Sequence, residues 1–255
     1  MTPSDSASDP RIPVSFYRDE VIITFMEQVV WSIIESSAIS GEICVADLSD
    51  DEVINSAISN FHGTPQGDYI ANEGEGPERE WEGEASEMNF GSRHDHELLE
   101  EGDRFLGQGK HELAILLYAT WIEHWINRII LVRSIGFGTP PELATVLIRS
   151  SRLELKIGKV WSSLDLDRFD KDLARAISRV MESRNGFVHF KWGGNSESIH
   201  DDQVKRQGVL AAEAKKTVEM LVELEDRTFF AGRTADIQAA FRRNYAKMVG
   251  GDGGA

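Results

Sequence analysis

The stretch Leu117–Ile130, LYATWIEHWINRII, decides the fold. Around it, from Glu112 to Arg133, apolar side chains occupy a helical wheel nearly all the way round, which is typical of a helix enclosed by other helices. These apolar residues include Leu116, Ile122, Trp125, Ile126, Ile129 and Ile130. We therefore expect this segment to be the central helix of an all-α protein. Its polar residues recur at helical spacing along one side; they are Thr120, Glu123, His124 and Asn127.

Further helical patterns follow one another along the chain with short Gly- and Pro-containing breaks between them. We predict helices near residues 95–107, 111–134, 140–150, 152–164, 168–190, 201–229 and 232–248. No alternation of strands with helices and no internal repeat is visible. The sequence therefore predicts an antiparallel helical bundle over residues 94–250.

The N-terminal part has a different composition. We predict an acidic helical extension over residues 1–61, in which Ser49-Asp50-Asp51-Glu52 begins a helix with an oxygen cap and an acidic first turn. Residues 43–45 are expected to form a short extended piece. Residues 62–93 are rich in Gly, Pro and Glu, which is the composition of a linker.

The net charge of −16 is unevenly distributed. Residues 1–95 contain 20 acidic and 4 basic residues, so their sum is 4 − 20 = −16. Residues 96–255 contain 23 of each, so their sum is zero. A neutral C-terminal domain can still present a basic groove to phosphate, and the total charge therefore does not exclude RNA as a substrate.

Several classes of protein are disfavoured by simple features of the chain. Cys44 is the single cysteine, which excludes an intrachain disulfide and a Cys-based zinc cluster. The apolar stretch Val21–Ile34 is interrupted by polar residues and is too short to cross a bilayer, and residues 1–12 lack the basic start of a secretory signal. We expect a cytoplasmic protein without a cofactor. His94-Asp95-His96 is a weak candidate for a metal site, because it lies at the end of the linker.

The segment Met181–Phe190, MESRNGFVHF, contains the residues that we expect to carry chemistry. Arg184 falls in the middle of an apolar helical stripe, where a permanent cation is costly unless an anionic group meets it. That group is either a carboxylate of a neighbouring helix, in a purely structural role, or a substrate. Asn185 adds a polar amide, and His189 adds a base whose ordinary pKa is about 6.5.

The spacing of these residues sets a geometric condition. Arg184 and His189 are five positions apart, or roughly 140° around an ideal helix. They share a site if the helix frays near Gly186, or if the site lies at an interface that both faces reach. Asn185 and His189 are four positions apart and share a face. A dimer would relax the condition.

The polar side of the central helix also has two interpretations. It is either a hydrogen-bonded polar seam inside the bundle, or it brings Glu123 or His124 to Arg184 or to the substrate. The residues alone leave both possibilities open.

The segment Arg184-Asn185-Gly186-Phe187-Val188-His189 resembles the signature of the HEPN superfamily, in which an Arg and a polar residue precede a His. The earlier helix LYATWIEHWINRII, with an acidic residue among aromatics, is also similar to that superfamily. The resemblance covers residues 94–250. It implies a metal-independent endoribonuclease that dimerises, often as a toxin or an anti-phage effector. It also implies a neighbouring antitoxin or regulatory protein as a possible partner.

The resemblance further implies a role for each residue of the motif. His189 would take the proton from an RNA 2′-OH, Arg184 would stabilise the charge on the phosphate, and Asn185 would orient one of them. Two alternatives stay open. The first is a non-catalytic HEPN module that binds RNA or a protein partner. The second is an unrelated helical protein in which Arg184 is simply paired in the core.

Overall fold

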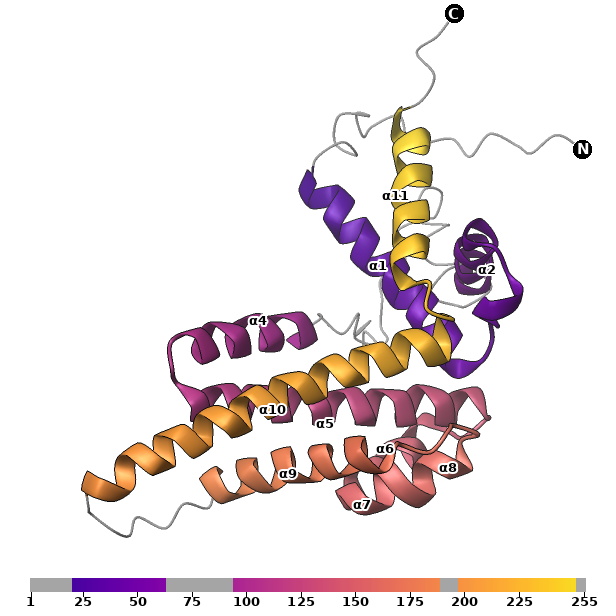
Figure 1. Ribbon diagram of the computed structural model, residues 1–255. Coiled ribbons are helices and arrows are strands. Elements are labelled where there is room, and N and C mark those ends of the chain that lie inside the picture. Colours follow the sequence, from indigo (N-terminus) through magenta and orange to yellow (C-terminus); the bar gives the residue numbers. More distant parts are fainter. Residues whose placement is uncertain (1–19, 63–93, 189–196, 251–255) are drawn as a thin grey trace, which may run out of the picture. The chain divides into compact units, whose positions relative to one another are not determined.

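A computed structural model describes residues 20–62, 94–188 and 197–250 of the chain (Figure 1). Every regular element within these ranges is helical, which confirms the predicted all-α class. None of the described helices is long and apolar enough to cross a membrane. The chain divides into two compact units. Unit 1 comprises Met1–Phe90 and Phe229–Ala255, and unit 2 comprises Gly91–Thr228.

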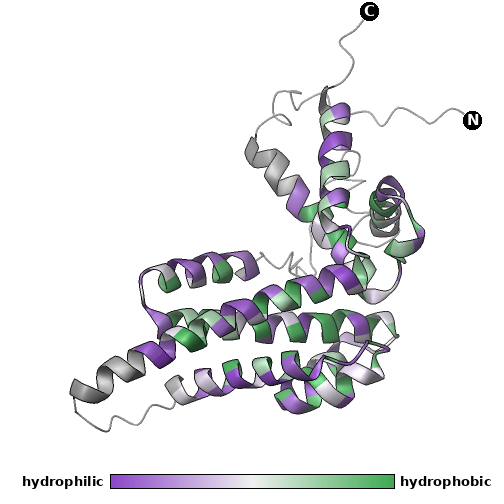
Figure 2. Cartoon of the chain, in the orientation of Figure 1, coloured by the Kyte–Doolittle hydropathy of each residue, from purple (hydrophilic) through white to green (hydrophobic). Residues whose placement is uncertain are grey.

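Unit 2 is built around α5 (His111–Gly136), as the apolar pattern predicted. Its isoleucines are fully buried; they are Ile122, Ile126, Ile129 and Ile130. Burying each of these side chains contributes about 1.5–3 kcal/mol. The helices α4 (His94–Gly107), α6 (Pro141–Ser150) and α9 (Lys171–Val188) pack directly on α5, and hydrophobic positions recur along these helices (Figure 2).

The helix α10 (Glu197–Phe229) is attached to α5 by polar contacts as well. Glu225 of α10 accepts hydrogen bonds from the indole of Trp125 and, at 2.9 Å, from the guanidinium of Arg128. Trp125 also stacks on Trp161, with the ring centroids 5.8 Å apart. The Trp161 indole in turn donates to the carbonyl of Asp167 at 2.9 Å, which fixes the turn that precedes α9.

The predicted helix over residues 152–164 contains an irregularity. It consists of α7 (Leu153–Leu155), a π-helical turn (Lys156–Val160) and α8 (Trp161–Ser163). A π turn holds one residue more than an α turn. Consequently Lys156, Val160 and Trp161 are all buried.

Unit 1 contains α1 (Glu20–Ser40), a 3-10 turn (Val45–Asp47), α2 (Asp50–His62) and α11 (Thr234–Gly250). The predicted start of α2 is confirmed by a capping box, in which the Glu52 backbone N–H donates to the Ser49 hydroxyl. The Ser49 backbone N–H and hydroxyl both donate to the Glu52 carboxylate. These hydrogen bonds lower the pKa of Glu52. Of the expected extended piece at residues 43–45, Cys44 is extended, but Val45 already begins the 3-10 turn.

Arg233 explains why that segment turns. Its guanidinium donates to the carbonyl oxygens of Val45 at 3.0 Å and Leu48 at 2.8 Å, and to the Asp50 carboxylate. An extended backbone at residues 45–48 would not place both carbonyls on one planar, fork-shaped donor.

The sequence predicted one domain over residues 94–250, which would include α11. In the structure α11 instead belongs to unit 1. It contacts α1 and α2. Its apolar residues recur at steps of three or four and are buried there; they are Ile237, Ala240, Phe241 and Tyr245. The apolar stripe was visible in the sequence, but its partner was not. The compact bundle therefore ends at Thr228 rather than at residue 250.

Candidate active site

Arg184 and Glu123 form an ion pair between α9 and α5. An Nη1 hydrogen of Arg184 is donated to Oε2 of Glu123. The side chains are 24% and 36% exposed, respectively, so the pair lies at the edge of water rather than in the dry core. The carboxylate partner that the apolar stripe required is thus Glu123, one of the two candidates on the central helix.

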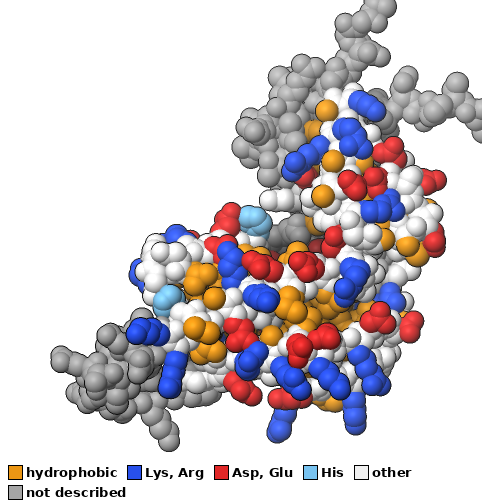
Figure 3. Space-filling view, in the orientation of Figure 1, with side chains coloured by type: hydrophobic (Ala, Val, Ile, Leu, Met, Phe, Trp, Pro, Cys, Tyr) orange, Lys and Arg blue, Asp and Glu red, His pale blue; other side chains and the backbone are white. Residues whose placement is uncertain are grey.

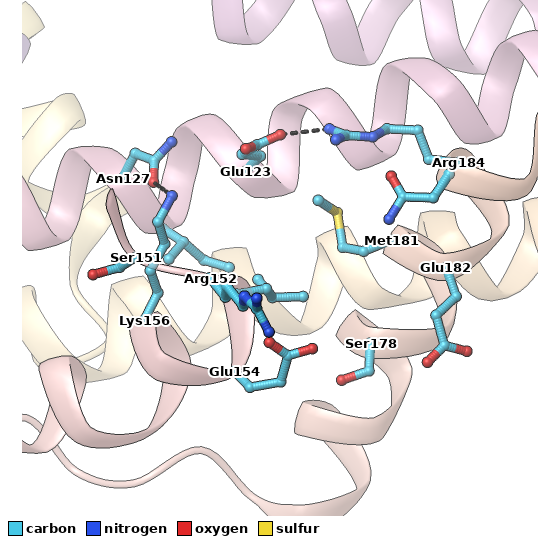
Figure 4. Close-up of a pocket in the computed structure, with 13 residues that line it drawn as sticks. Glu123, Asn127, Ser151, Arg152, Glu154, Lys156, Ser178, Met181, Glu182 and Arg184 are labelled. Atoms are coloured by element: carbon cyan, nitrogen blue, oxygen red, sulfur yellow. Dashed lines mark hydrogen bonds and ion pairs between the residues drawn. The ribbon is translucent and has the colours of Figure 1, made fainter. Parts of the chain in front are cut away.

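The pair opens onto a cleft of about 520 Å³ between α5, α9 and the start of the 153–163 segment (Figure 4). A cleft of this size accommodates a small polar group such as a nucleotide unit. The polar residues that line it include Glu123, Asn127, Arg152, Lys156, Arg184 and Asn185. Acidic and basic side chains are both present, so the cleft does not have an electrostatic potential of one sign. The positions of its individual charged groups determine what it binds.

Asn185 follows Arg184 on α9 and also lines the cleft. It is exposed. Met181 and Ser178, on earlier turns of α9, extend the same wall toward the 153–163 segment (Figure 4). Two of the three predicted motif residues are therefore brought together with Glu123.

Lys156 is a feature of the cleft that the sequence did not single out. Its side chain is only 7% exposed, and Nζ donates to Oδ1 of Asn127 at 2.7 Å. Desolvation by burial lowers the pKa of Lys156, and the charge of Glu123 counteracts this effect in part. The signal in the sequence was that Lys156 occupies an interior position, three residues after Leu153 and four before Val160.

The polar side of α5 separates into two parts. Glu123 and Asn127 face the cleft one helical turn apart, whereas the Thr120 hydroxyl donates to the carbonyl of Leu116 within α5 at 2.8 Å. His124 does not line the cleft; it is exposed, and its Nδ1 lies 3.9 Å from a carboxylate oxygen of Asp95 on α4. Of the two supporting candidates, only Glu123 therefore meets Arg184.

His189 lies outside the described residues, and its place in the site stays a prediction. The described part of the chain nevertheless shows whether the helix frays at Gly186, which is one of the two conditions set by the spacing. α9 continues as a regular helix through Val188, so it does not fray at Gly186. The direction in which His189 points stays a prediction.

His94-Asp95-His96 lies at the start of α4. Nδ1 of His96 is 3.3 Å from Glu100, and both side chains are largely exposed. Within the ranges that the structure describes, no group of three or more His, Cys, Asp or Glu side chains is arranged to hold a metal ion.

A scan against protein-family models and searches of curated proteins and of solved structures gave no match for this chain.

Proposed function

We propose that unit 2 is a HEPN-type, metal-independent endoribonuclease domain. The observation that carries the proposal is the position of Arg184, the arginine of the motif. It is oriented by Glu123 at the wall of a cleft that Asn185 also lines, and it remains partly open to water. A guanidinium held in this way suits an oxyanion, because its bond to Glu123 uses Nη1 and the guanidinium carries further N–H donors.

The proposed reaction needs no metal ion. Neutral His189 removes the proton from a ribose 2′-OH, and the 2′-oxygen attacks the adjacent phosphorus. The bond from phosphorus to the 5′-oxygen breaks, and that oxygen takes up a proton from water, while His189 returns its proton to the solvent. Arg184 stabilises the negative charge that builds up on the phosphoryl oxygens. The products carry a 2′,3′-cyclic phosphate and a 5′-hydroxyl. DNA lacks the 2′-OH and is not cleaved.

The proposal includes a homodimer. α9 is regular through Val188, and a separation of five positions on an ideal helix corresponds to roughly 140°. A second copy that faces the end of α9 supplies its own His189 imidazole to the Arg184 of the first copy. A role as a toxin or an anti-phage effector, controlled by an antitoxin or another regulatory protein, belongs to the same proposal.

The charge of unit 2 is compatible with a nucleic-acid substrate. Residues 96–255 have equal numbers of acidic and basic side chains, and the face seen in Figure 3 shows both signs interspersed over unit 2. This distribution predicts modest, local attraction of phosphate rather than strong non-specific binding. We therefore expect cleavage to depend on salt less steeply than for a strongly basic nuclease.

A second candidate function is a non-catalytic module that binds RNA or a protein partner. The Arg184–Glu123 pair favours it to the extent that the carboxylate neutralises the guanidinium. The two functions are distinguished by whether the protein cleaves the RNA that it binds. Tight RNA binding without fragments, unchanged by His189→Ala, would select the binding module.

The decisive experiment incubates total RNA in EDTA with the wild-type protein and with His189→Ala. We expect the wild type to produce fragments with 2′,3′-cyclic phosphate ends and the variant to produce none. His124→Ala is the matched control, because His124 is exposed and lies outside the cleft; it should cleave like the wild type. Cleavage that survives His189→Ala would refute the assignment of the base.

A further inference from the structure

The cleft contains a second cation that does not belong to the Arg–His motif. Lys156 is nearly buried, and its ammonium donates to a neutral acceptor, the side-chain oxygen of Asn127, at 2.7 Å. Among the described residues, no carboxylate forms an ion pair with it. A buried ammonium usually has an anionic partner, because desolvation disfavours an isolated charge. The charge of Glu123, one helical turn from Asn127, offsets only part of the desolvation. Lys156 therefore has room for a second anion in direct contact with its ammonium.

The partners of the two cations lie one helical turn apart on the central helix. Glu123 and Asn127 are four positions apart on α5, which is about 6 Å along the helix axis. Arg184 is held by the first of these residues and Lys156 by the second, as Figure 4 shows. The offset is similar to the spacing of successive phosphates in a single nucleic-acid strand. Both cations line the same cleft, so a single strand lying along α5 can bring neighbouring phosphates to them.

We propose that Lys156 forms a second phosphate subsite, which binds the phosphate next to the one that is cleaved beside Arg184. This inference rests on the proposed ribonuclease function. Asn127 is a positioning residue in this arrangement, because it holds the ammonium without neutralising it. The burial that lowers the pKa of Lys156 also makes its free charged state costly, and a bound phosphate would relieve that cost.

The π turn gives the subsite its structural basis. It begins at Lys156 and allows this residue to point inward together with Val160 and Trp161. Lys159 belongs to the same turn but is exposed and does not line the cleft. The chain therefore contains a matched pair of lysines, one inside the proposed subsite and one outside it.

The test uses an oligonucleotide that is 2′-O-methylated throughout except at one ribose, so that a single linkage can be cleaved. In two further versions, the phosphate on either side of that linkage is replaced by an uncharged methylphosphonate. kcat/KM is measured in EDTA for the wild type, Lys156→Met, Asn127→Asp and the control Lys159→Met. Thermal unfolding of each variant is recorded in parallel.

We expect one of the two replacements to lower kcat/KM of the wild type and of Lys159→Met by about tenfold, the effect of losing one charge-assisted contact. Lys156→Met should be slower by a similar factor on the fully charged oligonucleotide and should lose nothing further from the replacement. Asn127→Asp places a carboxylate on the ammonium. It should show the same insensitivity, with a melting temperature at or above that of the wild type.

Two outcomes would overturn the subsite, and they are distinguishable from failure of the proposed function. An equal loss in the wild type and in Asn127→Asp would show that Lys156 binds no phosphate, and this holds even if Lys156→Met does not fold. Insensitivity of the wild type to both replacements would show the same. Absence of any cleavage by the wild type, on the oligonucleotide and on total RNA, would overturn the ribonuclease function and the subsite together.

Discussion

Arg184 lies where a catalytic and a structural role predict different results for a single substitution. Its ion pair with Glu123 is partly exposed, and pairs of this kind contribute about 0–1 kcal/mol. We expect Arg184→Ala to abolish RNA cleavage while lowering the free energy of unfolding by no more than about 1 kcal/mol. Arg184→Lys should also cleave poorly, because it keeps the charge but loses the fork-shaped donor. Urea unfolding and cleavage are measured on the same samples. A drop of several degrees in melting temperature would instead identify Arg184 as a core residue.

Lys156 gives a prediction for the pH dependence of stability. Its lowered pKa means that the folded chain holds this proton less tightly than the unfolded chain, whose lysine has the ordinary value of 10.5. Between the lowered pKa and 10.5 the unfolded state binds more protons, so stability rises with pH across that window. Lys156→Met should lack this rise. Urea midpoints of both proteins from neutral pH to pH 10 measure it, and parallel profiles would show that burial does not penalise the ammonium.

Some individual site residues could be predicted from the sequence and others could not, for physical reasons. Glu123 and Arg184 were conspicuous, because each interrupts an apolar helical pattern. Lys156 was not, because a long aliphatic stem at an interior position is common in amphipathic helices, where the charged end reaches water. Its neutral partner, Asn127, is 29 positions away in the chain, and a contact over that separation has no local signature.

The helix α9 provides a prediction at the scale of an element. Gly186 lies within it, and an added Cβ would meet nothing within 4 Å. Gly186→Ala should therefore raise the free energy of unfolding by about 0.5–1 kcal/mol. Gly102 in α4 is the matched control, because a Cβ there would lie 2.8 Å from the buried Tyr118 ring. Gly102→Ala should be destabilising by about 1–3 kcal/mol. Thermal unfolding compares the two variants, and destabilisation by Gly186→Ala would mean that α9 is not regular at that point.

The elements themselves were predictable because most of them carry their own signals. The helix periodicity and the Gly- and Pro-containing breaks placed the helices of unit 2 within a few residues of their observed ends. The capping box at Ser49 and Glu52 also acts locally. The π turn at Lys156–Val160 was not predictable, because it depends on how Val160 and Trp161 fit against α5 rather than on the residues of the turn.

For the whole molecule, the division into units predicts how fragments behave. A fragment of residues 91–228 keeps all of unit 2, whereas residues 91–250 add α11 without α1 and α2. The longer fragment exposes the stripe of α11 that includes Ile237 and Phe241, both buried in the full chain. We expect it to bind a hydrophobic dye more strongly and to self-associate more on size-exclusion chromatography than the shorter one. Equal behaviour of the two fragments would show that α11 does not need unit 1.

The assignment of α11 to unit 1 was also the part of the fold that the sequence concealed. Helices that follow one another in a chain are usually neighbours in space, and on that basis α11 was expected beside α10 in one bundle. The contacts that decide otherwise join positions far apart in the chain. Arg233 and Asp50, for example, are 183 positions apart. Periodicity shows that α11 has an apolar face, but it does not show which helices cover that face.

The interleaved order of the two units has a consequence for biosynthesis. Unit 2 lies entirely between the two segments that make up unit 1. Because a ribosome releases the chain from its N-terminal end, α1 and α2 emerge before unit 2, but they cannot complete their core until α11 has emerged after it. Any control of the cleft that requires an intact unit 1 therefore begins only after α11 has left the ribosome.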